Sequence, residues 1–204
     1  MARALSAALA VLAVCGHATS LAGPSASAEI AGSRGASAAA PPELRSLEPH
    51  AALIGEGEMR FLGLAVYRAR LWAPRRFEIE AYAGHPFLLE LIYARALSGQ
   101  AIADRSLSEM HRLSAATAAQ EQRWLGFMRA SFADVTPGDR LSAWSDGRGT
   151  VRVFHNARVQ GQLQDAEFAR IFFGIWLDEH TSAPALREAL GGAPSPLERR
   201  ASGS

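Results

Sequence analysis

The sequence contains no lysine, and its single cysteine, Cys15, lies close to the N-terminus. All 21 basic residues are arginines, and with 20 acidic residues they leave a formal net charge of +1. This balance gives no indication of a nucleic-acid or anionic-membrane partner, because such partners usually require an excess of positive charge. One cysteine cannot form an internal disulfide, and a cysteine-rich metal site is excluded as well.

Motifs for metal binding and for common catalytic chemistry are also missing. The six histidines show neither an H-x-x-x-H nor an H-E-x-x-H spacing, so we predict no metal centre and no cofactor. Residues 146–149 (DGRG) lack the strand-loop-helix context and the lysine of a phosphate-binding loop. No serine stands in a G-x-S-x-G elbow, and we interpret Ser182 as the cap of a helix.

Long apolar runs are absent, and none reaches the roughly 20 residues that a membrane-spanning helix needs. A short run at residues 4–14 follows Arg3 and precedes an A-x-A pattern at residues 26–28. This order is typical of a secretory signal peptide. We therefore expect residues 1–28 to be removed on export to the periplasm. The segment before Cys15 does not favour a lipoprotein, because Val14 is large where a small residue is needed.

Composition divides the remaining chain into three parts. Residues 29–46 are rich in Ala, Ser, Gly and Pro, which predicts a disordered linker. Residues 191–204 contain three glycines, two prolines and charged residues, which predicts a flexible tail. Residues 47–190 lie between them and are numerous enough for one domain with its own core.

Strand patterns and helix patterns occur in separate blocks along this domain. Alternating apolar and polar residues predict strands over residues 59–72, 77–82 and 87–97, arranged as an antiparallel meander whose charged side chains form exposed pairs. Helical spacing predicts two helices next, the second beginning with a capping box at Thr117. A hairpin and a third strand follow over residues 141–163, and Asp165 and Ser182 introduce two final helices. This order predicts an α+β fold, with an antiparallel sheet that carries a helical layer on one face.

Several motifs in this order resemble the chalcone isomerase-like family, in its bacterial branch. They are Gly55-Glu-Gly57, residues 60–67 (RFLGLAVY), Leu97-Ser-Gly99-Gln, residues 105–110 (RSLSEM), Pro137-Gly-Asp139 and residues 172–187. The resemblance covers about residues 55–190 and implies an open-faced β-sandwich. The family includes isomerases that close the ring of a chalcone, and non-catalytic relatives that bind fatty acids.

The resemblance also places the isomerase residues on this chain. The family's strand threonine, tyrosine, helix asparagine and helix threonine fall on Leu62, Ile102, Glu109 and Ile171. None keeps its chemistry, because donors that meet developing enolate charge are replaced, mostly by apolar side chains. Tyr67 stands where fatty-acid-binding relatives place a tyrosine-like donor near the ligand carboxylate. We therefore predict a non-catalytic protein that binds a small apolar or amphipathic ligand, such as a fatty acid. The predicted ligand site comprises Arg60, Leu62, Tyr67, Ile102, Glu109 and Ile171.

Two of these residues admit two interpretations each. Arg60 lies one position beyond the family's arginine. Either it forms a structural salt bridge with Glu56, Glu58 or Glu109, or a bulge turns it into the site, where it binds an anion. Glu109 is either the buried partner of Arg60 or a helix-surface acid paired with Arg105 and Arg112. An isomerase or lyase that uses Arg60 and Glu109, and a ligand-free scaffold, remain as alternative functions. Tyr67 and the aromatic residues at 168–176 also fit a plain core.

Overall fold

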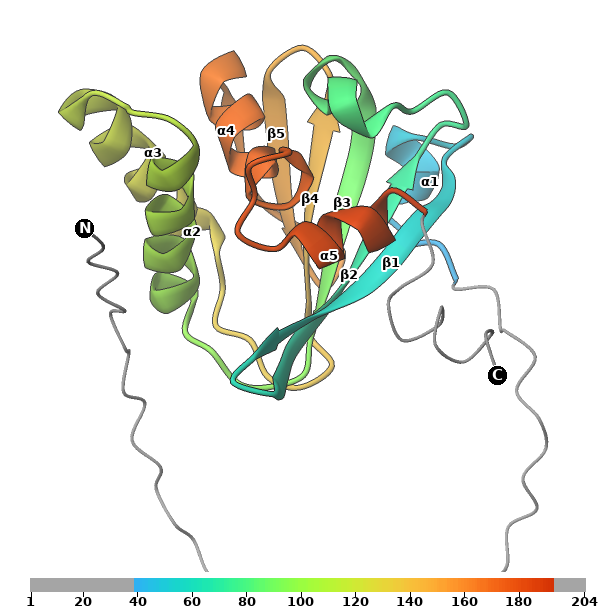
Figure 1. Ribbon diagram of the computed structural model, residues 1–204, viewed down its shortest axis with the longest axis horizontal. Helices are drawn as coiled ribbons and strands as arrows, with labels where there is room; N and C mark the ends of the chain where they lie inside the picture. The colour runs from blue at the N-terminus through green and yellow to red at the C-terminus, as the bar shows by residue number, and fades with distance from the viewer. Residues whose placement is uncertain (1–38, 193–204) are drawn as a thin grey trace, which may run out of the picture. The chain divides into compact units, whose positions relative to one another are not determined.

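The computed structural model describes residues 39–192; the predicted signal peptide, residues 29–38 of the predicted linker and residues 193–204 of the predicted tail lie outside the described residues. The centre of the domain is a six-stranded sheet in which the strands lie side by side in chain order (Figure 1). Each strand runs antiparallel to the next. The strands are β1 (Ala52–Phe61), β2 (Leu64–Ala73), β3 (Pro86–Tyr93), β4 (Arg140–Asp146), β5 (Thr150–His155) and β6 (Arg158–Gln164).

Most helices lie on one face of this sheet, so the molecule has the predicted α+β architecture (Figure 1). The helices are α1 (Leu44–Leu47), the 3₁₀ helix η1 (Ile79–Gly84), α2 (Gly99–Leu113), α3 (Ala118–Ser131), α4 (Ala166–Leu177) and α5 (Pro184–Leu190). The helix pair α2 and α3 connects β3 to β4, and α4 and α5 follow the last strand. Among residues 39–192, no helix combines the length and apolar character that crossing a bilayer requires.

Local capping explains where the long helices begin. The hydroxyl of Ser98 accepts the backbone N–H of Ala101 at the start of α2. Thr117 and Gln120 form the predicted capping box at the start of α3. The Asp165 carboxylate accepts two backbone N–H groups at the start of α4, which also confirms its predicted role.

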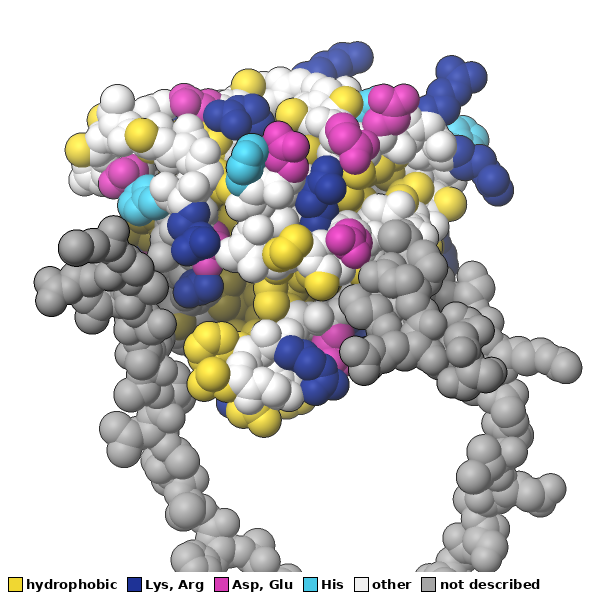
Figure 2. All heavy atoms as spheres, in the orientation of Figure 1, with side chains coloured by type: hydrophobic (Ala, Val, Ile, Leu, Met, Phe, Trp, Pro, Cys, Tyr) yellow, Lys and Arg dark blue, Asp and Glu magenta, His cyan; other side chains and the backbone are white. Residues whose placement is uncertain are grey.

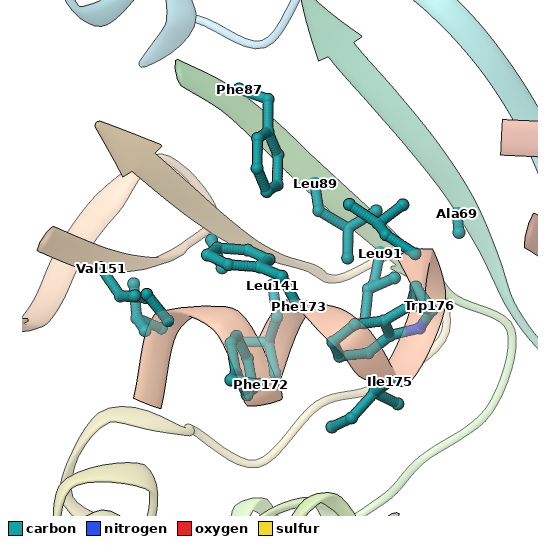
Figure 3. Close-up of a cluster of buried hydrophobic side chains, with 14 of the residues drawn as sticks. Ala69, Phe87, Leu89, Leu91, Leu141, Val151, Phe172, Phe173, Ile175 and Trp176 are labelled. Atoms are coloured by element: carbon teal, nitrogen blue, oxygen red, sulfur yellow. The ribbon is translucent and has the colours of Figure 1, made fainter. Parts of the chain in front are cut away.

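Helix α4 forms the centre of the core, and every residue from Ile171 to Leu177 is buried. Its side chains meet the inner face of the sheet, where Phe173 packs edge-on against Phe87 with 4.6 Å between ring centroids (Figure 3). On its other side Phe168 contacts Phe127 of α3. A helical segment that is apolar all round, as α4 is from Ile171 onward, needs such cover on every side. The aromatic residues of α4 therefore fill the space between the sheet and the α2–α3 pair.

The prediction of one strand over residues 59–72 is wrong, because the chain reverses within it. Leu62 and Gly63 form a two-residue turn between β1 and β2, with φ angles of 50° and 80°. Positive φ at both positions is the geometry of a type I′ hairpin turn. Such a turn usually has asparagine or glycine at its first position. Because leucine occupies that position here, the sequence did not indicate a turn.

The strand predicted over residues 77–82 is wrong as well, since residues 79–84 form η1. Ile79 and Tyr82 are three residues apart, so they share one side of a 3₁₀ helix. Tyr82 is buried, and its hydroxyl donates to the carbonyl of Arg170 in α4, 2.8 Å away. Burial against α4 thus prevails over the alternating pattern.

The packed domain begins earlier than the predicted boundary at residue 47. Glu43 and Leu44 are both buried, on the sheet face opposite the main helical layer. The Glu43 carboxylate accepts the Ser142 hydroxyl at 2.8 Å, and Arg140 bridges Glu43 and Glu90. Residues 41–46 therefore belong to the fold. Glu90 is only 2% exposed, so its predicted place among exposed charge pairs is also wrong.

Candidate functional site

The β1–β2 hairpin separates two of the predicted site residues from the rest. Leu62 occupies its turn and is 86% exposed. The Arg60 guanidinium lies 2.5 Å from a carboxylate oxygen of Glu58 and donates to the carbonyl of Gly63 at 3.0 Å. Both side chains are therefore on the hairpin surface. Arg60 forms the structural pair that one of its two interpretations predicted.

A bulge is present near Arg60, but it does not turn this arginine into the core. The strand register shifts between Met59, which pairs with Tyr67, and Arg60, which pairs with Ala65. Val66 is thus the extra residue, and it lies on β2. Met59 packs against the core, whereas the Arg60 side chain remains 57% exposed.

Tyr67 lies on the inner face of β2, between the sheet and the helical layer. Its hydroxyl oxygen accepts the indole N–H of Trp176 at 3.0 Å, and its ring meets Tyr93 edge-on at 5.7 Å. Within residues 39–192 no acceptor is found for the hydroxyl hydrogen of Tyr67. The indole fixes the position of the oxygen, and the O–H remains able to donate.

Burial raises the pKa of Tyr67 to about 12. The hydrogen bond from Trp176 opposes this shift, the Glu109 carboxylate adds to it, and Arg105 opposes it. Burial also raises the pKa of the neighbouring Tyr93. At neutral pH the Tyr67 hydroxyl is therefore a protonated hydrogen-bond donor, and it is poorly suited to act as a general base.

Glu109 is the buried acid on the inner side of α2. It is 8% exposed and forms ion pairs with Arg105 and, at 3.6 Å, with Arg112. The Ser182 hydroxyl donates to the same carboxylate at 2.7 Å. The predicted pairing with Arg105 and Arg112 is confirmed, but the carboxylate is not on the helix surface, and Arg60 is not its partner.

Ser182 is not the cap that the sequence predicted. Helix α5 begins after Ala183, without a side-chain cap, and the Ser182 hydroxyl instead ties this loop to α2. The sequence signal was ambiguous, because a serine two residues before Pro184 is typical of a helix start. Trp176 was expected in the core, and nothing in its spacing indicated its bond to Tyr67.

The two apolar replacements also lie in the helical layer. Ile171 of α4 is 1% exposed, and Ile102 of α2 is half-buried against the same core. The structure thus brings together Tyr67, Ile102, Glu109 and Ile171 on one side of the sheet, and it leaves Arg60 and Leu62 on the hairpin. No group of three or more His, Cys, Asp or Glu side chains suited to a metal ion occurs in the part of the chain that the structure describes.

The surface is hollowed near the start of α2. A depression of about 320 Å³ is lined by residues 96–98 and 134–136, at the start of α2. Leu97 lines it and packs against the core, as does Ile102 in the first turn of α2. Apolar side chains are visible at the base of a hollow above the β1–β2 hairpin in Figure 2. None of the six predicted site residues lines the depression itself.

Comparisons with known proteins agree with this architecture. The family model for chalcone isomerase-like proteins matches residues 52–192. A fatty-acid binding protein from Arabidopsis thaliana has a similar crystal structure, with a TM-score of 0.56 and 12% sequence identity over 70% of this chain and 87% of that chain. At this identity the likeness concerns the fold alone. No curated protein sequence matches significantly. Since the family model spans well over half of its length, the chain belongs to the chalcone isomerase-like family.

Proposed function

We propose that this protein is a non-catalytic binding protein for a small amphipathic carboxylate, such as a fatty acid. The observation that carries the proposal is the Tyr67 hydroxyl, which Trp176 holds in place and which still has a hydrogen to donate. A carboxylate oxygen is a natural acceptor for such a donor. Arg105, which is close enough to affect the pKa of Tyr67, supplies positive charge nearby.

The apolar surroundings suit the tail of such a ligand. Ile102 and Leu97 are only partly buried at the edge of the core, and the depression beside Leu97 opens next to them. Because Phe172, Phe173 and Trp176 already fill the centre, a long acyl chain would enter along α2 and displace the half-buried side chains at this edge. Ligand pockets of this kind combine many apolar contacts with a few placed polar groups.

The same geometry favours binding over catalysis. The positions that resemble the isomerase set carry an exposed leucine, one buried and one half-buried isoleucine, and a glutamate whose carboxylate has three partners. None of these four side chains acts as a hydrogen-bond donor that could meet negative charge on a substrate. An enolate formed there would lack the stabilisation that accelerates such a reaction.

We further propose that the protein acts outside the cytoplasm, in the periplasm. The support is the sequence of residues 1–28, with its single arginine, short apolar run and A-x-A pattern. Native mass spectrometry of the protein isolated from its own cells tests both proposals together. The polypeptide mass reports whether the mature chain begins at Glu29, and any added mass that dissociates as a fatty acid reports the ligand.

Tyr67→Phe is the variant that tests the site. We expect it to weaken the binding of a fluorescent fatty acid about tenfold, which corresponds to roughly 1.4 kcal/mol for a lost hydrogen bond to a charged group. Tyr82→Phe is the matched control, because it removes a buried tyrosine hydroxyl that bonds to α4 away from the site. It should leave binding unchanged, as should Arg60→Ala.

Three outcomes would contradict the proposal. Equal loss in both tyrosine variants would show that only stability had changed. A protein that never carries or binds an acid would leave the ligand-free scaffold as the better interpretation. Turnover of a chalcone that depends on Glu109 would instead favour the isomerase.

A further inference from the structure

The β1–β2 hairpin ends in an apolar tip that the proposed ligand site does not use. Phe61, Leu62 and Leu64 are 53%, 86% and 58% exposed. They are three of the four large apolar side chains that are exposed within residues 39–192, and the fourth, Val159, lies on β6 at the other edge of the sheet. We refer to Phe61, Leu62 and Leu64 as the hairpin tip.

The hairpin tip projects beyond the rest of the sheet. The pairing of β2 with β3 ends at Tyr67 and Tyr93, so the residues from Phe61 to Ala65 have no third strand beside them. Figure 1 shows this hairpin reaching past the ends of the neighbouring strands. The apolar side chains gathered there are visible in Figure 2. A hairpin that projects in this way can enter surroundings of different polarity without any change in the packing of the core.

The backbone at the tip gives a second, independent indication. Leu62 has a φ angle of 50°, in the left-handed region that asparagine and glycine occupy with less strain. Its side chain contributes little to the core, because it is 86% exposed. A strained and solvated leucine does not stabilise the folded domain, so its contribution is expected in a contact with something else.

The charges beside the tip indicate what that contact is. Arg60 is on the hairpin itself, Arg68 is exposed on β2, and Arg95 is exposed just after β3, where Ala94 bonds to Val66. Glu58, the partner of Arg60, is the carboxylate on this part of the hairpin. The whole chain is nearly neutral, but its tip presents apolar side chains with arginines behind them. This arrangement matches a lipid surface, which takes apolar groups between its acyl chains and arginines at its phosphates.

We propose that the hairpin tip inserts into the headgroup region of an anionic lipid bilayer, with Arg68 and Arg95 at the lipid phosphates. This docking surface is separate from the proposed ligand site, so either proposal can fail alone. Insertion of three side chains with two or three arginines gives reversible binding, because each group adds a modest contribution.

A chain that begins at Glu29 allows a direct test. It keeps every described residue and omits the apolar stretch at residues 4–14, which could bind vesicles by itself. It also contains no cysteine, so Leu62→Cys carries a single polarity-sensitive fluorophore at the tip. Val159→Cys is the matched control, since it labels an exposed apolar position on β6.

With vesicles of equal parts phosphatidylglycerol and phosphatidylcholine, we expect a blue shift from the label at position 62 and none at position 159. In flotation of unlabelled protein, Leu62→Asn should reduce vesicle binding about tenfold. This variant suits the turn, so lost binding cannot be ascribed to unfolding. Arg68→Gln with Arg95→Gln should reduce binding to anionic vesicles and not to pure phosphatidylcholine.

Three results would overturn the proposal. One is the absence of any shift at position 62, and another is an equal shift at both labelled positions. The third is a shift at position 62 that appears without vesicles as protein concentration rises, because it would identify the tip as an interface between two copies of this chain.

Discussion

At the scale of single residues, Glu109 shows how a buried charge is accommodated in this domain. Two arginines of its own helix and the Ser182 hydroxyl surround the carboxylate. The arginines are largely exposed, so water screens their attraction, whereas the 2.7 Å hydrogen bond from Ser182 is partly buried. We infer that the serine contributes more to stability than either ion pair does.

Ser182→Ala should therefore lower the free energy of unfolding by about 2 kcal/mol, the size of a hydrogen bond to a charged group. Urea denaturation measures this change. Ser108→Ala is the control, because Ser108 is exposed on the same helix α2 and should shift stability by less than about 0.5 kcal/mol. A similar small change in both variants would show that the Ser182 bond contributes nothing.

At the scale of elements, helix α5 lies so close to β1 that the strand needs glycine beneath it. A β-carbon at Gly55 would stand 2.1 Å from the carbonyl oxygen of Ala189, and the backbone of α5 cannot yield as a side chain can. This close approach gives a physical reason for the Gly55-Glu-Gly57 motif.

Gly55→Ala should displace α5 and lower the free energy of unfolding by about 3 kcal/mol. Gly126→Ala, in the interior of α3, is the matched control, because nothing lies within 4 Å of the added carbon. There alanine should stabilise the helix by about 0.5–1 kcal/mol. The midpoint temperatures of thermal unfolding of the two variants should thus shift in opposite directions from that of the parent protein. A Gly55→Ala protein as stable as the parent would disprove the close packing of α5 on β1.

Elements with a clear local signal were predictable from the sequence, and those that lack the usual residue or depend on distant contacts were not. The capping box at Thr117 and the cap at Asp165 act within a few residues, and both are confirmed. The β1–β2 hairpin was missed because Leu62 occupies a turn position where asparagine or glycine usually occurs. The segment around Tyr82 alternates like a strand, but its hydrogen bond to α4 fixes a 3₁₀ helix.

At the scale of the whole molecule, the same distinction separates fold from site. Blocks of strand and helix periodicity suffice for an α+β prediction, since the order of elements limits how they can pack. The site depends on pairs far apart in the chain, such as Tyr67 with Trp176 and Glu109 with Ser182. No periodicity encodes such a pair. Arg60, a predicted site residue, lies on the surface because the chain reverses at Leu62 and Gly63.

Because the chain contains no lysine, the pH dependence of the stability of the whole domain in alkaline solution depends on its tyrosines. The sequence has three, and burial raises the pKa of Tyr67 and Tyr82 to about 12 and that of Tyr93 further. Unfolded tyrosine ionises near pH 10, and arginine keeps its charge throughout. Between pH 10 and 12 these are therefore the side chains of residues 39–192 that titrate differently in the two states.

A tyrosine whose pKa is raised by folding adds stability that is complete below pH 10 and is lost as the pH rises towards 12. We expect the free energy of unfolding to fall in this window by about 1.4 kcal/mol per pH unit for each tyrosine proton that the folded state keeps and the unfolded state has lost. Near-ultraviolet absorbance should show no tyrosinate in the native protein at pH 10.5, and ordinary ionisation in guanidinium. Native tyrosinate near pH 10 would show that the tyrosines are accessible, and that the Tyr67 hydroxyl is not the buried donor on which ligand binding is proposed to depend.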